Sequence, residues 1–437
     1  MIISFSIKTV NRSLCKEIKS LASKVMTVIL TKEEKAMASG KYGPGIAKCV
    51  NILKKFGEAL GAEKMVKLSS AHTMPKEPPE LLKEMTEGVN QTGTFTTLHA
   101  LMSAFDPHLW RKMGISEEFA LKELPLHEQR LTIYRRLGFY ETYTCLPMLV
   151  GNLPRRGDFI SWIGSCAQLF VNSLLGARTN RDGGVVNLAA AITGRAPYRG
   201  LFLDENRYGQ VLVELDGLDP YQLTYTDLGA IGYYVGGKAQ DRNVVINGLP
   251  KELDMSQLLG LMAPLPASGS VCLCHMVGLT PEASSLEEAF GHRKPTEVIK
   301  VGKKAISETK ALHALNQNEK IDMVVLGCPH CTIQELKKIA SFLDGKKIGD
   351  GRRLWIGSPY QMYYLAQTMR YSQIIENAGG VISSSCMATI PDSPIPDDVK
   401  IIATNSFKAS HYISRLTKGR VKVVVQEMDE CIHSILS

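Results

Sequence analysis

The stretch DMVVLGCPHCTIQELKKIASFL, residues 322–343, decides the fold class. It combines a short apolar run, a polar turn with two cysteines, and apolar residues at helical spacing, which is the repeating unit of α/β proteins. The same order recurs in NVVINGLP (243–250), SVCLCHMVG (270–278), RRLWIGSPYQMYYLAQTM (352–369), GGVISSSCMA (379–388), KIIATNSFKASHYI (400–413) and VKVVVQEMDECIHSIL (421–436). The sequence therefore predicts an α/β fold with largely parallel sheets.

The first half of the chain is richer in helical patterns. FVNSLLGARTNRDGGVVNLAAAITG (170–194) predicts a helix, a polar turn with glycines, and a second apolar segment. The change of pattern at about residue 243 predicts two α/β lobes, 26–242 and 243–437. We interpret residues 1–25 as the product of an upstream start or as a dispensable extension, rather than as a targeting peptide, because Met26 begins a stretch that reads as a natural protein start.

Composition narrows the function. The 437 residues are 44% hydrophobic and 22% charged, values typical of globular proteins. No apolar run approaches the roughly 20 residues needed to cross a bilayer, so we expect no membrane span. The net charge of +8 is spread along the chain without a basic and aromatic RNA-reading module. These features favour a small anionic ligand over a nucleic acid.

The cysteines indicate free thiols or metal ligands. Scattered cysteines without a secretory signal predict a reducing cytoplasm. The C-P-H-C group at 328–331 lacks the context of a redox dithiol and has no second pair to complete a zinc site. Five others are predicted to be small buried residues on helices or a strand. These five are Cys15, Cys49, Cys272, Cys274 and Cys431.

Three single cysteines remain at predicted turns: Cys145, Cys328 and Cys386. Three thiolates that converge from distant loops could hold an iron–sulfur cluster with one open iron, which can act as a Lewis acid. Free buried cysteines are the alternative, and the residues alone leave both readings open. Ligands bind beyond the carboxyl ends of parallel strands, where Cys328, Cys386, Ser358, Ser406 and Lys408 are all predicted to fall.

Five motifs carry a family resemblance. They are ETYTCLP (141–147), NSLLGARTNRDGG (172–184), CHMVGLTPEA (274–283), VLGCPH (325–330) and TNSFKASHY (404–412). In this order they resemble the large, catalytic subunit of the aconitase X family. The resemblance implies clustered aconitase-like α/β domains around a central cleft that holds an iron–sulfur cluster, expected to be 4Fe-4S. It also implies a hydro-lyase: archaeal members dehydrate mevalonate 5-phosphate in the mevalonate pathway, and bacterial members dehydrate cis-3-hydroxy-L-proline.

The resemblance also implies roles for individual residues. Cys145, Cys328 and Cys386 would be the cluster ligands, and Cys331 would be incidental. Ser165 and Lys408 would be catalytic. Residues expected to bind the substrate are Ser70, His72, Thr97, His99, Arg178, Arg181, Ser406 and Lys408. The alternative for the two arginines is a structural ion pair with Asp182 or another carboxylate, and for His72 and His275 a hydrogen-bonded place in the core.

Dehydration needs a base that removes a proton and a Lewis acid that takes the hydroxide. The family resemblance implies that the base is a serine on a swivelling domain, and we recognise no swivelling-domain segment in these residues. We therefore expect a heterodimer with a small swivelling-domain subunit.

Three stretches depart from the family pattern. TMPKEPP (73–79) replaces a small, Ser/Gly-rich loop, WIGSC (162–166) stands where W-x-E-S-N is usual, and TLHA (97–100) stands where T-L-N-P is usual. These changes predict retained lyase chemistry on a different substrate. Cys166 could instead be a fourth thiolate that closes the cluster. A further alternative is a non-catalytic paralogue that serves redox sensing or assembly.

Overall fold

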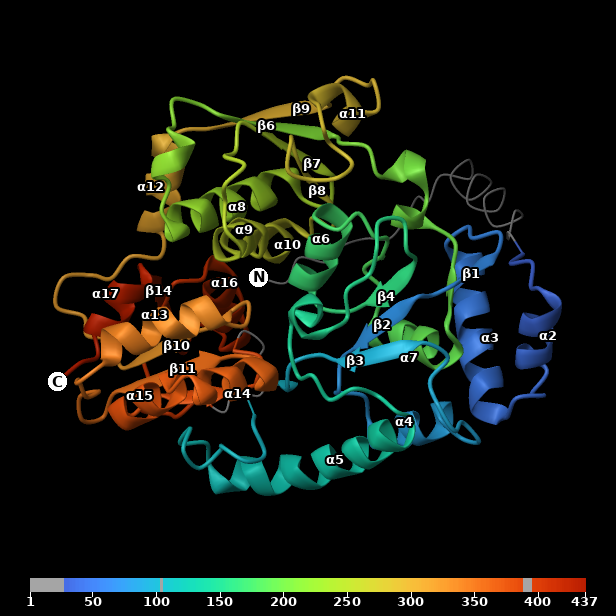
Figure 1. Cartoon of the computed structure of the whole chain (residues 1–437), viewed down its shortest axis with the longest axis horizontal. Coiled ribbons are helices and arrows are strands. Elements are labelled where there is room, and N and C mark those ends of the chain that lie inside the picture. The colour runs from blue at the N-terminus through green and yellow to red at the C-terminus, as the bar shows by residue number, and fades with distance from the viewer. Residues whose placement is uncertain (1–26, 103–104, 388–394) are drawn as a thin grey trace, which may run out of the picture.

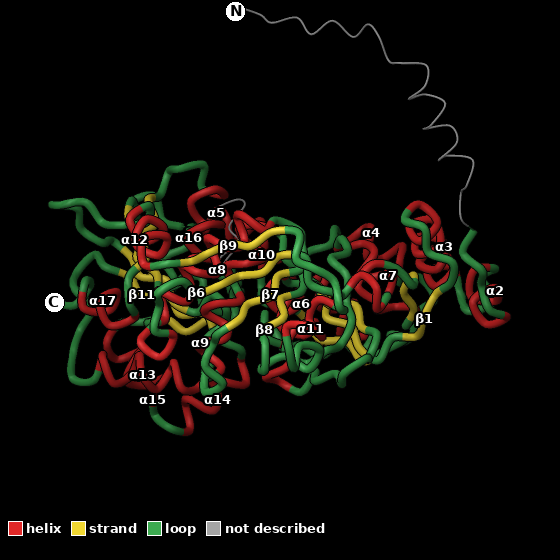
Figure 2. The backbone as a smooth tube through the Cα atoms, turned by 90° about the horizontal axis from the view of Figure 1, so that it is seen from above, coloured by secondary structure: helices red, strands yellow, loops and turns green. Residues whose placement is uncertain are grey.

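The computed structural model describes residues 27–102, 105–387 and 395–437, and it contains three parallel sheets. The proposed extension 1–25 lies outside the described residues. Figure 1 shows the sheets as three groups arranged around a common centre. Seen from above in Figure 2, the same groups form an elongated assembly, with the sheet that contains β11 (Arg353–Gly357) at one end and helices α2 (Lys32–Ala38) and α3 (Pro44–Ala59) at the other.

The first group contains the sheet β3-β2-β4 and the antiparallel pair β1-β5. Its strands are β1 (Met65–Lys67), β2 (Ser70–Thr73), β3 (Phe95–Leu98), β4 (Ile160–Trp162) and β5 (Arg195–Pro197). Its helices are α2 (Lys32–Ala38), α3 (Pro44–Ala59), α4 (Pro79–Met85), α5 (Glu117–Arg136), α6 (Ser165–Ser173) and α7 (Gly184–Thr193). The predicted helix, turn and apolar segment over 170–194 are thus α6, a loop and α7.

The second group is a four-stranded parallel sheet of order β8-β7-β6-β9. Its strands are β6 (Val211–Leu215), β7 (Val244–Asn247), β8 (Cys274–Met276) and β9 (Glu297–Val301). Its helices are α8 (Tyr225–Ala239), α9 (Met255–Met262), α10 (Pro264–Gly269), α11 (Leu286–Phe290) and α12 (Lys303–Ala311). The boundary predicted after residue 242 falls inside this sheet, because β6 pairs with β7 across it. The chain therefore divides by its sheets into three units rather than two lobes.

The third group is a five-stranded sheet of order β12-β11-β10-β13-β14, parallel throughout. Its strands are β10 (Met323–Leu326), β11 (Arg353–Gly357), β12 (Val381–Ser383), β13 (Ile401–Thr404) and β14 (Lys422–Val425). Its helices are α13 (Ile333–Leu343), α14 (Tyr360–Thr368), α15 (Tyr371–Ala378), α16 (Phe407–Leu416) and α17 (Met428–His433). These elements match the strand–loop–helix units predicted from the sequence.

Both faces of this third sheet are buried, as the continuous apolar runs predict. Along β10, Val324 and Leu326 pack toward α13, α15 and α17. Met323 and Val325 pack on the other face, with α16 and the segment 105–120. That segment comes from the first group, so the first and third groups share a core.

The described residues contain no helix that is both long and apolar enough to cross a membrane. The nine cysteines in this part of the chain are all free thiols.

Candidate active site

A cavity of about 330 Å³ lies where the carboxyl ends of the first and third sheets face each other. The first group lines it with Met74, His99, Cys145, Ile163, Gly164, Ser165, Gln168, Arg181, Asp182 and Gly183. The third group lines it with Gly327, Cys328, His330, Cys386, Met387, Lys408 and Tyr412. No described residue of the middle group is among them. The cavity therefore occupies the position that parallel sheets offer to ligands.

The three cysteines expected to act together all line this cavity. Cys145 and Cys328 are 6% and 7% exposed, and Cys386 is half-buried. Cys328 follows β10, Cys386 follows β12, and Cys145 follows Tyr140, which bridges to Thr97 of β3. Parallel strands end at the same edge of the third sheet, which brings the Cys328 and Cys386 loops to one side. The order of successive strands reverses between β10 and β13, a position where ligands commonly bind.

Two hydrogen bonds hold the cysteine loops. The backbone amide of His330 donates to Sγ of Cys145 at 3.3 Å and joins the first group to the third. The Ser406 hydroxyl donates to the carbonyl of Cys328 and also accepts from the Ala409 amide as the N-cap of α16. Ser406 thus positions the Cys328 loop and does not line the cavity.

Lys408 is the buried cation of the site. It lies on the first turn of α16 and is 8% exposed. Burial lowers the pKa of its ammonium group, but the negative charge of Cys328, Cys166 and Cys145 in their thiolate forms outweighs this effect and raises the pKa. Burial raises the pKa of the Cys328 thiol to about 12, despite the opposing charge of Lys408. Without a bound ligand the Cys328 thiol is therefore protonated at neutral pH.

The neighbouring wall of the cavity is polar. Ser165 and Gln168 lie on the first turn of α6, and the Gln168 amide donates to the carbonyls of Trp162 at 2.6 Å and Asn180 at 3.2 Å. His99 follows β3, and its imidazole is neutral because burial, followed by Lys408 and His330, lowers its pKa to about 3. Arg181 is exposed and also lines an adjacent cavity of about 770 Å³.

Four residues expected at the site lie elsewhere. Thr97 accepts from Asn152 at 2.9 Å and lies 2.9 Å from Nδ1 of His72, within the core. Ser70 accepts a 3.0 Å hydrogen bond from the Trp162 indole. Arg178 pairs with Asp204 and donates to the carbonyl of Phe202, so the structural alternative holds for this arginine. None of these four side chains, Ser70, His72, Thr97 and Arg178, lines the cavity in the described part of the chain.

The structure also gives the partners of Asp182 and His275, the two other residues named in these alternatives. Asp182 pairs with Arg199, not with Arg178 or Arg181. His275 is a core histidine whose Nε2 lies 2.7 Å from the carbonyl of Arg207.

Cys331 and Cys166 are fully buried and line no part of the cavity, Cys166 lying on the first turn of α6.

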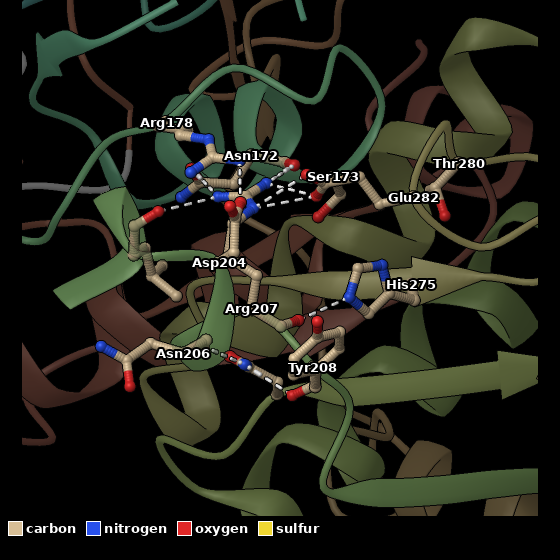
Figure 3. Close-up of polar contacts among 12 residues, drawn as sticks. Asn172, Ser173, Arg178, Asp204, Asn206, Arg207, Tyr208, His275, Thr280 and Glu282 are labelled. Carbon is tan, nitrogen blue, oxygen red and sulfur yellow. Dashed lines mark hydrogen bonds and ion pairs between the residues drawn. The ribbon is translucent and has the colours of Figure 1, made fainter. Parts of the chain in front are cut away.

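The two longest motifs meet away from the cavity, at a polar junction around Arg207 (Figure 3). Arg207 lies between the first and second groups, is 3% exposed and forms a bidentate ion pair with Glu282 of CHMVGLTPEA at 2.6–3.0 Å. It also donates to the carbonyl of Asn172 of NSLLGARTNRDGG at 2.8 Å. The amide of Asn172 in turn donates to Cys272 and Thr179. These motifs therefore fix α6 against the middle group.

Sequence reasoning missed His330, Gln168 and Tyr412 as lining residues. Helical spacing could have found two of them, because Gln168 lies three residues after Ser165 and Tyr412 four residues after Lys408. His330 had a signal too, since it stands between the two cysteines of C-P-H-C.

Comparison with known proteins identifies related sequences along nearly the whole chain. Residues 27–205, 209–311 and 321–437 match the aconitase X first, second and third domains. The phosphomevalonate dehydratase large subunit of Methanocaldococcus jannaschii is 37% identical over 90% of this chain and 96% of its own length. The cis-3-hydroxy-L-proline dehydratase of Hypocrea jecorina is 30% identical over 90% of this chain and 67% of its own length.

A solved structure is similar throughout. The holo-form crystal structure of Thermococcus kodakaraensis aconitase X superposes with a TM-score of 0.80 at 31% identity. The match covers 93% of this chain and 100% of that chain.

Proposed function

The chain belongs to the aconitase X family, and from that premise we propose that it is the large subunit of a hydro-lyase that dehydrates a small anionic hydroxy acid such as mevalonate 5-phosphate. The observation that carries the proposal is the single cavity lined by Cys145, Cys328, Cys386 and Lys408. Thiols that could hold a metal cluster and a fixed cation that could hold an anion are the two elements a dehydratase of this kind needs.

The cysteines suit an iron–sulfur cluster better than a single ion. Among the described residues, no three His, Cys, Asp or Glu side chains lie close enough to bind one metal ion. In a cluster each thiolate binds a different iron, so the ligands stand further apart. Cys145, Cys328 and Cys386 would hold the cluster, which when bound supplies a Lewis acid for the substrate hydroxyl. Cys166 lies outside the cavity lining, which supports three protein ligands and an open fourth iron.

The protein residues bind and orient the substrate. The Lys408 ammonium pairs with the carboxylate and stabilises the negative charge that develops beside it when a proton is removed. Arg181 forms no ion pair within the described residues and lines both this cavity and the adjacent one, so it suits a second anionic group such as a phosphate. Ser165 and Gln168 on α6 offer polar contacts to the body of the substrate.

The alternative substrate, cis-3-hydroxy-L-proline, carries an ammonium group that needs an anionic partner. Asp182 supplies the only carboxylate of the cavity lining in the described residues, and Arg199 already pairs with it. The remaining charges, Lys408 and Arg181, are both positive. This balance favours a substrate with two anionic groups over a zwitterion.

Relatives named large subunits suggest that the active protein is a heterodimer with a small partner. The chain spans 94–96% of three such large subunits but 67% of two cis-3-hydroxy-L-proline dehydratases. The family resemblance implies that the base that removes the proton is a serine. We assign this serine to the swivelling domain of that small subunit. The free thiols favour a cytoplasmic location.

Anaerobic iron and sulfide analysis with EPR tests the cluster. Wild-type chain should hold iron and sulfide, and Cys145→Ala, Cys328→Ala and Cys386→Ala should each remove or cripple the cluster. Cys331→Ala is the matched control, because this neighbouring cysteine is buried and lines no part of the cavity. If reconstituted wild type binds no iron, the lyase mechanism fails, and a non-catalytic paralogue becomes the better reading.

Substrate assays with the co-expressed small subunit test the reaction. Mevalonate 5-phosphate should lose water, and cis-3-hydroxy-L-proline should react much more slowly. The reverse preference would assign the alternative reaction.

A further inference from the structure

One wall of the cavity has an unusual pair of residues in contact. Gly164, between β4 and α6, has a φ of +92°, a conformation that L side chains rarely adopt. A Cβ added at this position would lie 2.8 Å from Nε2 and 2.9 Å from Cδ2 of His99. The imidazole therefore lies in the space that any side chain at 164 would need.

The rest of His99 is fixed in place. Its backbone amide donates to the carbonyl of Thr73 at 2.8 Å, which continues the pairing of β2 and β3. Nδ1 lies 3.4 Å from the carbonyl of Ala100, so the tautomer that satisfies this contact carries its proton on Nδ1. His72 packs behind the ring, with centroids 5.4 Å apart. These contacts leave Nε2 as a hydrogen-bond acceptor at the cavity wall.

A neutral acceptor selects among the groups of an anionic hydroxy acid. The lone pair of Nε2 can accept a hydrogen bond from a hydroxyl group. An ionised carboxylate or phosphate oxygen has no hydrogen to donate, so its lone pairs would repel that of Nε2. The cations Lys408 and Arg181 line the same cavity, and they can take the anionic groups instead. The substrate orientation that satisfies all three residues places its hydroxyl-bearing carbon beside His99.

We propose that His99 and Gly164 form one specificity-determining pair, in which the absent side chain at 164 admits the imidazole and Nε2 accepts a hydrogen bond from the substrate hydroxyl. This inference rests on the proposed function, because it assumes a hydroxy acid in the cavity. His99 thereby limits the cavity to substrates that present a neutral donor at this wall.

Binding tests the hydroxyl contact. Calorimetric titration of the reconstituted heterodimer with mevalonate 5-phosphate should show about tenfold weaker binding for His99→Ala, the cost of one hydrogen bond. His99→Gln keeps a neutral acceptor and should restore most of the affinity. The control His127→Gln changes a histidine that lines a different cavity and should bind as wild type does. Unchanged binding by His99→Ala, or no rescue by His99→Gln, overturns the contact.

A stability cycle tests the pair without any substrate. Gly164→Ala should lower the melting temperature of the wild type more than that of His99→Ala, by at least about 2 °C. Backbone strain at the positive φ is present in both backgrounds and cancels in the comparison. If Gly164→Ala lowers the melting temperature equally in the wild type and in His99→Ala, the two residues are not coupled and the proposed pair is overturned. If the wild type binds neither mevalonate 5-phosphate nor cis-3-hydroxy-L-proline, the proposed function fails, and this cycle still decides whether the two residues are coupled.

Discussion

The amide of His330 donates a hydrogen bond to Sγ of Cys145 at 3.3 Å, although the two residues are 185 positions apart in the chain. The contact ties a loop of the first sheet to a loop of the third. It also stabilises negative charge on the sulfur, which is the form that binds a metal. The cysteine cavity therefore exists only when the first and third groups are docked.

Lys408→Met should abolish most activity and spare the cluster. The methionine keeps an unbranched side chain that is one atom shorter and removes the charge, while the thiol ligands remain. We expect kcat/KM of the heterodimer to fall by at least about 100-fold, or about 2.7 kcal/mol of transition-state stabilisation. Lys310→Met, at a half-exposed ion pair with Asp227, is the control. Equal losses of iron and activity would instead give Lys408 a structural role.

Arg207→Met should destabilise the chain by about 3–5 kcal/mol, measured by urea unfolding. The substitution leaves Glu282 without its partner and removes the donors that serve the carbonyls of Asn172 and Leu201. Arg135→Met is the matched control, because Arg135 also makes a bidentate pair, with Glu141, but is 59% exposed. That pair should contribute under about 1 kcal/mol. Similar losses for both variants would contradict a special role for the buried junction.

Gly327→Ala should be far more harmful than Gly345→Ala, although both glycines have positive φ values, +86° and +68°. A Cβ at 327 would lie 2.1 Å from the carbonyl oxygen of Gly357, whereas a Cβ at 345 meets nothing within 4 Å. The second substitution therefore incurs only backbone strain of about 1–2 kcal/mol. Gly327→Ala must also push β10 away from β11. We expect it to lower the free energy of unfolding, measured by urea unfolding, by more than about 4 kcal/mol and to weaken iron binding through Cys328.

Acid should destabilise the protein partly through His99. Its pKa is lowered to about 3 in the folded chain, first by burial and then by Lys408 and His330, against 6.5 when unfolded. Below pH 6.5 the unfolded chain therefore binds a proton that the folded chain does not, and stability falls as the pH falls. Between pH 7.5 and 5 this contributes about 2 kcal/mol, which His99→Gln should remove. Parallel pH–stability curves for the two proteins would contradict a buried neutral imidazole.

The sequence predicted the third sheet well because its signals are local. In β10 and α13, a buried apolar run leads to Cys328 and then to Thr332, which caps the helix with Glu335 three residues later. The convergence of Cys328 and Cys386 followed from the rule for parallel strands. Cys145 could not be placed in this way, since its loop reaches the cavity through contacts between groups.

Other features depend on contacts that are distant in sequence. Nothing local shows that β6 pairs with β7 and β9, so the boundary after residue 242 was misplaced. The sequence motifs led us to expect substrate binding by Thr97 and Arg178, yet Thr97 contacts Asn152 and Arg178 pairs with Asp204. A motif indicates that residues matter together, and only the fold separates a ligand from a structural partner.

The middle group lines no part of the cavity among the described residues, yet Arg207 fixes α6 against it. Substrate choice and mechanical support are therefore assigned to separate stretches of chain. Residues of 209–311 that lie away from Glu282 and from the adjacent cavity that Arg181 lines could be varied to tune heat tolerance or solubility with little effect on which acid is dehydrated. Substitutions intended to change the substrate should instead be made at the few loop residues around Gly164 and His99.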